Sequence, residues 1–170
     1  QSRINVYGLS SFKKIKEPKE DGKTFFDNAK IKSKFGQKIF KKPCFSDDSG
    51  FCVDALNNKP GIKSKRFFDK FLSKKQAFDF IIKAAKNKNN YKASFISVIS
   101  LTLDENHHVS FFGKVEGKIA LKPKGSNGFG YDPIFIPHHH KKTFAEMSLH
   151  EKNKISHRKI ALLKLKNFLF

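Results

Sequence analysis

Cysteine is scarce in this chain. Only Cys44 and Cys52 occur among 170 residues, and they do not form a Cys-x-x-Cys pair. The scarcity argues against a disulfide framework and against a structural zinc site. We expect both side chains to be small buried hydrophobes in a reducing cytosol.

Long apolar runs are also missing. No run reaches the length needed to cross a bilayer, and the first residues lack the apolar segment of a secretory signal. These absences predict a soluble, cytoplasmic protein with no membrane partner. With 38% hydrophobic residues, 170 residues can bury one substantial core, so we expect a single domain over residues 1–170.

Acidic residues are few: 15 Asp and Glu stand against 35 Lys and Arg, giving a formal charge of +20. Such a charge attracts polyanions. However, the basic residues are spread from Arg3 to Lys166, and Lys, Asn, Ile and Phe are abundant together, as in a compositional bias. This spread favours a solvated surface over a nucleic-acid site, and it is compatible with a small phosphate-bearing ligand.

The hydrophobic periodicity predicts an α/β chain. Tryptophan is absent, and 20 Phe supply most of the large apolar surface. We expect a short strand over 4–7, helices over 24–40 and 74–86, an antiparallel hairpin of strands 94–103 and 109–121, and a last helix from 148 to the end. Capping boxes mark the starts of the first and last helices, at Thr24 and Ser148. The glycine-rich segment 122–137 should be irregular.

An acidic turn is expected at 47–50, between the apolar runs 44–46 and 51–56. Because Asp47 and Asp48 are adjacent, their side chains should diverge. One of them would bind a hard cation while the other points into supporting structure. The alternative is an ordinary turn in which Asp48 or Ser49 bonds its own backbone.

Two further segments carry groups suited to binding. Phe129, Tyr131 and Asp132 lie among glycines, where they suit stacking on a planar base and hydrogen bonding to its edge. The alternative is a hairpin loop whose aromatic rings close the core. The three consecutive histidines at 138–140 point in different directions, so we assign them to an exposed loop rather than to a metal.

The start of the last helix is rich in polar and basic groups, among them Lys152, Ser156, His157 and Arg158. The partial positive charge of a helix start welcomes an anion. The alternative is the solvated face of an amphipathic helix.

Taken in order, these segments resemble the inosine triphosphate pyrophosphatase family, whose members clear ITP, dITP and XTP from nucleotide pools. The resemblance covers nearly the whole chain. It is carried by Ser46-Asp47-Asp48-Ser49-Gly50 with Val53-Asp54-Ala55-Leu56 and Pro60-Gly61, by Gly128-Phe129-Gly130-Tyr131-Asp132-Pro133-Ile134-Phe135, and by Thr143-Phe144-Ala145-Glu146-Met147-Ser148 followed by Glu151-Lys152-Asn153-Lys154-Ile155-Ser156-His157-Arg158.

The resemblance implies an elongated, curved mixed sheet flanked by helices, with two lobes around a central cleft. It also implies a homodimer that uses Mg2+ to convert deaminated purine nucleoside triphosphates to monophosphate and pyrophosphate. By the same resemblance, Asp48 is the general base and a metal ligand, with Glu20 and Asp47 as further metal ligands. The implied substrate contacts are Ser49, Lys32, Phe129, Gly130, Tyr131, Asp132, Lys152, His157 and Arg158.

One part of the family pattern is not found. Family members begin with a Ser/Thr-x-Asn-x-x-Lys turn that cradles the triphosphate, and no such turn occurs between Gln1 and Phe25. The missing turn predicts a chain that is shortened at its N-terminus.

Two rival interpretations remain. A Maf-type nucleotide pyrophosphatase is less favoured, because the Ser156-His157-Arg158 segment and the Phe129 to Asp132 loop fit the first family. A basic nucleic-acid-binding or scaffold protein on an impaired enzyme fold is the non-enzymatic alternative.

Overall fold

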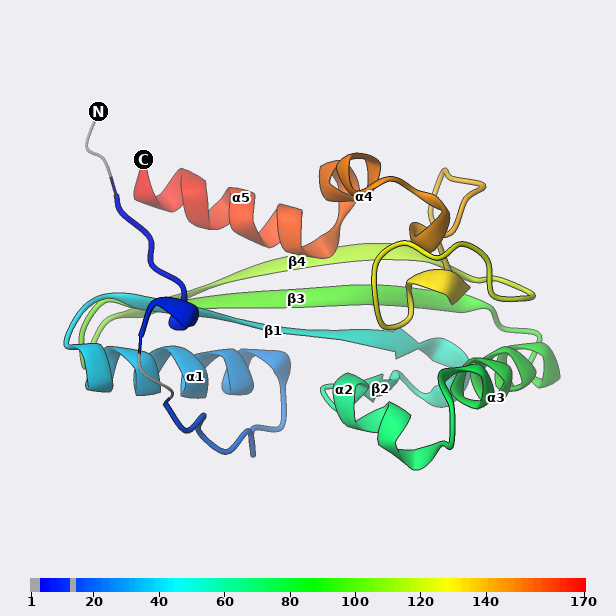
Figure 1. The fold of residues 1–170 in the computed structure, drawn as a ribbon, viewed down its shortest axis with the longest axis horizontal. Coiled ribbons are helices and arrows are strands. Elements are labelled where there is room, and N and C mark those ends of the chain that lie inside the picture. Colours follow the sequence, from blue (N-terminus) through cyan, green and yellow to red (C-terminus); the bar gives the residue numbers. More distant parts are fainter. Residues whose placement is uncertain (1–3, 13–14) are drawn as a thin grey trace.

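The computed structural model describes residues 4–12 and 15–170, which form an elongated molecule on one five-stranded sheet (Figure 1). The strand order is β2 (Lys59–Gly61), β1 (Cys44–Val53), β3 (Lys92–Thr102), β4 (His108–Ile119) and β5 (Phe135–Pro137). The α/β class is confirmed. Every strand pairing within the described residues is antiparallel, so the expectation of a mixed sheet was wrong for this part of the chain. A parallel pair needs a long crossover between neighbouring strands. The long connection from β2 through α2 and α3 to β3 does return the chain in the same direction, but β1 lies between these two strands, so they do not pair.

Helices cover both faces of the sheet (Figure 1). α1 (Phe25–Phe40) packs on one face of β1 and β3, and α5 (His157–Leu169) packs on the other face, against β3 and β4. Farther along the sheet, α2 (Ser64–Phe67) and α3 (Lys74–Asn87) lie on the same side as α1, and α4 (Leu149–Ile155) lies on the same side as α5 (Figure 1). Within the described ranges, no helix is long and apolar enough to cross a membrane.

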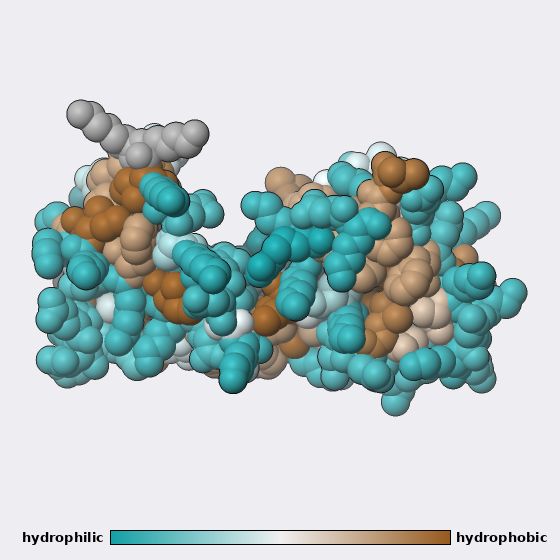
Figure 2. All heavy atoms as spheres, turned by 90° about the horizontal axis from the view of Figure 1, so that it is seen from below, coloured by the Kyte–Doolittle hydropathy of each residue, from teal (hydrophilic) through white to brown (hydrophobic). Residues whose placement is uncertain are grey.

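Two separate hydrophobic cores lie along the shared strands. The larger contains Phe51, Phe95, Phe135 and Phe144 together with residues of α3, and the smaller lies beneath α5. The smaller core is formed by Ile99, Leu101, Phe111, Ala161 and Leu165. Two cores on one sheet give two lobes, and Figure 2 shows the side chains as two masses with a hollow between them.

Several predicted elements are confirmed. β3 and β4 form the expected hairpin, paired from Lys92 with Lys118 to Thr102 with His108. α3 follows the predicted apolar face, and α1 begins at the Thr24 capping box, where Asp27 takes the place of the usual Glu. The histidines at 138–140 are exposed.

The predicted acidic turn at 47–50 was wrong, because residues 44–53 form one continuous strand. β1 pairs with β3 along its whole length, from Cys44 opposite Thr102 to Val53 opposite Ala93. Side chains alternate between the two faces of a strand. Asp47 and Ser49 therefore lie on one face of the sheet, and Asp48 lies on the other.

The predicted last helix is broken into two. Ser156 has an extended backbone, with ψ of 151°, and its hydroxyl accepts a hydrogen bond from the Lys159 amide, so it ends α4 and caps α5. The strand expected at 4–7 is not formed. Ile4, Val6 and Tyr7 are exposed and pair with no strand of the described chain, and a strand without a partner is not stable in water.

Candidate active site

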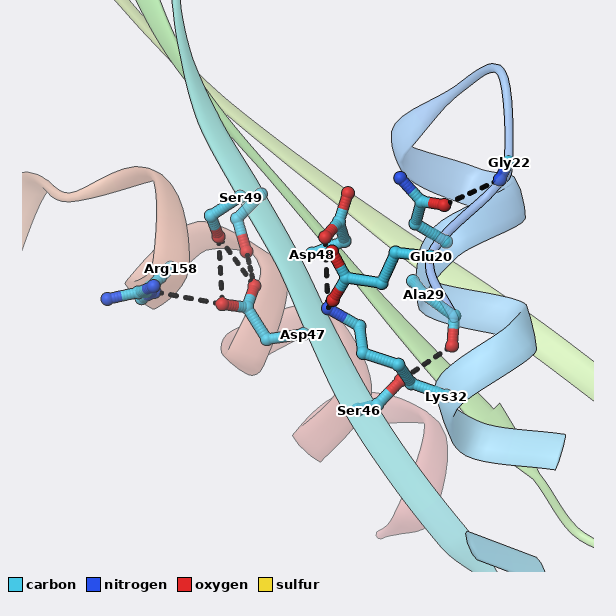
Figure 3. A network of polar contacts seen from close by, with 11 residues as sticks. Glu20, Gly22, Ala29, Lys32, Ser46, Asp47, Asp48, Ser49 and Arg158 are labelled. Carbon is cyan, nitrogen blue, oxygen red and sulfur yellow. Dashed lines mark hydrogen bonds and ion pairs between the residues drawn. The ribbon is translucent and has the colours of Figure 1, made fainter. Parts of the chain in front are cut away.

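The predicted site residues fall into two clusters on opposite faces of β1 (Figure 3). We call them the acid cluster, made of Glu20, Lys32 and Asp48, and the ring cluster. The ring cluster consists of Asp47, Ser49, Phe129, Asp132, Lys152, His157 and Arg158. A single strand divides them, since Asp47 and Asp48 are neighbours in the chain.

In the acid cluster, one ammonium bridges two carboxylates. Nζ of Lys32 lies 2.9 Å from Oδ1 of Asp48 and 3.0 Å from Oε1 of Glu20. The three groups come from the loop before α1, from α1 itself and from β1 (Figure 3). Lys32 was predicted to face phosphate, and here it faces the acids.

Asn28 fixes the loop that carries Glu20. Its Oδ1 accepts a hydrogen bond of 2.9 Å from the Gly22 amide, and the Asn28 side chain is fully buried. A Cβ at Gly22 would lie 2.5 Å from Cβ of Asp27 and 2.6 Å from Oδ1 of Asn28. Only glycine therefore lets this loop approach the first turn of α1 so closely.

The electrostatics of this cluster favour a cation. Burial raises the pKa of Asp48, and the Lys32 ammonium offsets this only in part. Burial would lower the pKa of Lys32, but the hydrogen bonds and charges of Asp48 and Glu20 outweigh it, so that the pKa is raised. The Asn28 side chain also lowers the pKa of Asp48, but neither its Nδ2 nor the buried Oδ2 of Asp48 makes a hydrogen bond of good geometry among the described residues. An orphaned carboxylate oxygen beside a second carboxylate is a fitting donor set for a hard divalent metal.

The protein offers two carboxylates there rather than three. Asp47, predicted as a third metal ligand, points to the other face and is fully engaged there. Among the described residues, no group of three or more His, Cys, Asp or Glu side chains is placed to hold a metal. Mg2+ is commonly bound through one or two carboxylates together with substrate phosphates, so two are sufficient.

On the other face, Asp47 holds Arg158. Oδ2 of Asp47 accepts from Nε of Arg158 at 3.0 Å, and the same carboxylate accepts from the hydroxyls of Ser49 and Ser97. Four contacts saturate the carboxylate and fix the guanidinium. Ser49, predicted as a substrate contact, is thus turned toward Asp47.

Phe129 is the exposed centre of the ring cluster, with 61% of its surface accessible. Nζ of Lys152 lies 4.8 Å from the centre of its ring, and Cζ of Arg158 lies 5.3 Å from it. The backbone of this loop is held by Asp132, whose Oδ2 accepts from the Phe129 amide at 2.7 Å and pairs with Lys152. Gly130 has a positive φ of 61° and open space where a side chain would be.

Two predicted pocket residues are buried behind the loop. Tyr131 was expected to line the pocket; instead it packs in the larger core, stacks on Phe51 and donates its hydroxyl to the Ser64 carbonyl. His157 is stacked on Phe95, with ring centres 4.9 Å apart. Burial lowers the pKa of His157 to about 3, so it is neutral at pH 7, and its Nδ1 has no partner in the described part of the chain.

Some residues of the site were not found from the sequence. Ser97 donates a hydrogen bond to Asp47, from which it is 50 residues away in the sequence. Phe95 stacks on His157, and the Lys152 ammonium lies over the ring of Phe144. The available signal was the serines that interrupt the apolar strand β3, where a buried hydroxyl must find a partner.

The surface also holds a cavity of about 620 Å³, which contains no residue of either cluster. It is lined by Tyr91, Lys118, Ile119, Ala120, Leu121, Lys122, Lys124 and Ile136.

Solved structures with the same fold define the class of this protein. The Ham1 protein of Staphylococcus aureus has a TM-score of 0.89 and 38% identity, and the match covers 97% of this chain and 86% of that one. A HAM1 protein from Coxiella burnetii has a TM-score of 0.84 and 39% identity over 91% of this chain and 80% of its own. The molecule is therefore an α/β protein of the Ham1 type.

The sequence comparisons agree with the fold. A family model described as the Ham1 family matches residues 1–168, and the chain belongs to this family. A dITP/XTP pyrophosphatase of Treponema denticola is 42% identical over 156 residues, which are 90% of this chain and 80% of that protein. One of Porphyromonas gingivalis is 38% identical over 170 residues, which are 99% of this chain and 87% of that protein.

Proposed function

We propose that this protein hydrolyses deaminated purine nucleoside triphosphates, namely ITP, dITP and XTP, to the monophosphate and pyrophosphate. The observation that carries the proposal is the pairing of an acid cluster and a ring cluster about residues 47–49 of β1. Among the described strands, β2 pairs only with residues 51–53 of β1, so residues 47–49 lie at an edge of the sheet that one nucleotide can reach from both faces. Relatives named dITP/XTP pyrophosphatase, at 42% and 38% identity, support this substrate class. No observation favours the nucleic-acid-binding alternative.

The reaction adds water to the α-phosphorus and breaks its bond to the bridging oxygen, which leaves with the pyrophosphate. Asp48 and Glu20 would hold Mg2+, which supplies charge neutralisation and a more acidic water when bound. Asp48 accepts the proton that the attacking water loses, and burial favours this protonated form of the carboxyl. Lys32, whose ammonium lies beside these acids, would meet the phosphates.

The ring cluster would bind the base. The exposed ring of Phe129 offers a face for stacking, and Lys152 and Arg158 flank it, so we assign these cations to the base rather than to the leaving pyrophosphate. Neutral His157 keeps a nitrogen free of partners in the described structure. Deaminated purines carry a keto oxygen, O6, where adenine carries an amino group. Protein donors that face O6 would have no acceptor when adenine is bound, and leaving these buried donors unpaired would reduce the affinity for ATP.

Pyrophosphate release from ITP, XTP and ATP in the presence of Mg2+ tests the proposal. We expect ITP and XTP to be cleaved at least about a hundredfold faster than ATP, in line with the loss of a buried hydrogen-bond set. Asp48→Asn should keep the fold and lose turnover by about a hundredfold or more. Equal cleavage of ATP and ITP, or an active Asp48→Asn protein, would contradict it.

Two finer parts of the proposal follow from the family resemblance. We expect the protein to act in the cytoplasm and to form a homodimer. Sedimentation of the purified protein measures the second point, and a monomer at micromolar concentration would refute it.

A further inference from the structure

Nζ of Lys32 lies between Glu20 and Asp48, the two carboxylates that would hold the metal under the proposed function. We propose that Lys32 is a built-in counter-ion that competes with the metal and must leave the two carboxylates before a divalent cation binds. The inference rests on the proposed function, because it concerns the metal ligands assigned there, and it adds a role to Lys32.

The contacts of Lys32 make it a competitor. Both of its ion pairs go to the candidate ligands, at 2.9 Å to Asp48 and 3.0 Å to Glu20. Asp48 is more than nine-tenths buried, and its second oxygen has no partner among the described residues. The site is therefore built for more positive charge than one ammonium supplies.

A dication and the ammonium cannot share this position. The two carboxylates carry one more negative charge than Lys32 neutralises, whereas a divalent metal would balance both of them. An ammonium left between the same two carboxylates would be strongly repelled by a bound metal, because like charges are poorly screened at a partly buried site. Metal binding thus requires that Lys32 move.

The side chain is able to move without opening the core. The side chain of Lys32 is 21% exposed and that of Glu20 is 35% exposed, whereas that of Asp48 is 9% exposed. A lysine on a flexible four-carbon stem can swing while α1 and β1 remain in place. The displaced ammonium would then be free for a phosphate, so that metal binding prepares the site for the triphosphate.

Titration of the protein with Mn2+ by calorimetry, in the absence of nucleotide, tests the competition. Lys32→Met should bind Mn2+ about tenfold more tightly than the unmodified protein, a usual size for coupling between two ligands of one site. Mg2+ should also raise the melting temperature of Lys32→Met more than that of the unmodified protein. Lys32→Gln should show the same gain and serves if Lys32→Met does not fold by circular dichroism.

Lys34→Met is the matched control, because Lys34 is exposed on the same helix and forms no ion pair among the described residues. This substitution removes the same charge without a contact to Glu20 or Asp48. The Mn2+ affinity of Lys34→Met should therefore differ less than twofold from that of the unmodified protein. An unchanged or weaker affinity in Lys32→Met, or an equal gain in Lys34→Met, overturns the inference.

The same titration separates this inference from the proposed function. If Lys32→Met gains Mn2+ affinity while the unmodified protein cleaves no purine triphosphate, Lys32 is the counter-ion and the proposed substrate is wrong. If ITP is cleaved and the gain is absent, the pyrophosphatase stands and the competition does not.

Discussion

At the scale of single residues, Asp47 and Asp48 show how two neighbours acquire different chemistry. Asp48 is buried beside Lys32 with one oxygen unpartnered among the described residues. Asp47 accepts four hydrogen bonds and orients Arg158 beside Phe129. Under the proposed function, we infer that Asp47 positions Arg158 for the base.

Removal of the Asp47 charge tests this role. In Asp47→Asn, the guanidinium of Arg158 loses its charged partner, so we expect KM for ITP to rise about tenfold with a smaller change in kcat, as when a charge-assisted contact is lost. Steady-state kinetics at saturating Mg2+ measure both constants. Asp79→Asn is the control, because it removes the same charge from an exposed residue of α3 that belongs to neither cluster. A loss confined to kcat would show that Asp47 acts in the chemical step.

His157 links protonation to stability. Its pKa falls from 6.5 to about 3 on folding because it is buried. Below pH 6.5 the unfolded chain therefore takes up a proton that the folded chain does not, and stability is lost as the pH falls toward 3. The loss from this group should approach about 1.4 kcal/mol per pH unit.

The variant His157→Phe isolates this effect. Phe keeps the stacking on Phe95 and removes the proton site. We expect its free energy of unfolding at pH 7 to lie within about 1 kcal/mol of the original value and to fall less steeply between pH 6.5 and 4.5. Urea unfolding at several pH values measures the slopes. Equal slopes in the two proteins would mean that His157 is not the titrating group.

At the scale of elements, α5 reaches β4 through Gly113. A Cβ at this position would collide with the His157 carbonyl and with the backbone of Ala161. The close approach seats the start of α5, and with it Arg158, against the sheet.

Gly113→Ala should therefore shift α5 away from β4. We expect a loss of about 2 kcal/mol or more in unfolding free energy, as for other overpacked cores, together with weaker binding of ITP. Urea unfolding and KM measure the two effects. Gly8→Ala is the control, because the nearest atom to its Cβ is the Ser10 hydroxyl at 3.6 Å. Equal stability of the two variants would contradict the expectation.

The elements also show what the sequence reveals and what it hides. Periodicity and capping boxes were sufficient for α1, α3 and the hairpin, because these are local signals. The continuity of β1 was missed, since adjacent acids resemble a turn until Arg158 and Ser97 are seen to pair with one of them. The break at Ser156 was missed because the apolar pattern continues across it.

The site was predictable to a similar extent. The motifs of the family resemblance name Asp48, Phe129 and Arg158 as candidates, but they carry no information about the face of the sheet on which each side chain lies. The division into two clusters follows from β1 being a strand, and the burial of Tyr131 follows from its packing on Phe51 and Phe68. Such contacts join residues far apart in the sequence, so no local pattern contains them.

At the scale of the whole molecule, charge is the dominant property. The 15 acids can neutralise the charge of no more than 15 of the 35 basic residues, so cations repel one another over the surface. Screening by salt weakens such repulsion, since the Debye length falls from about 30 Å at 0.01 M to about 8 Å at 0.15 M.

We therefore expect the melting temperature to rise by a few degrees when NaCl is raised from about 0.02 to 0.3 M, a shift of roughly 1 kcal/mol for a domain of this size. Differential scanning fluorimetry measures it. Sucrose at the same osmolality is the control. It does not screen charge, so it should not produce the part of the rise in melting temperature that comes from screening. A melting temperature that falls with salt would show that attractive ion pairs outweigh the repulsion.

The alternation of side chains along β1 has a consequence for how such a protein can change over evolutionary time. Under the proposed function, substitutions on the Phe129 side would change which heterocycle is accepted, while the groups for bond cleavage on the other side of the strand would stay intact. Insertion or deletion of one residue within 44–53 would instead exchange the two faces and destroy both at once. Selectivity is thus free to drift, whereas the length of this strand is not.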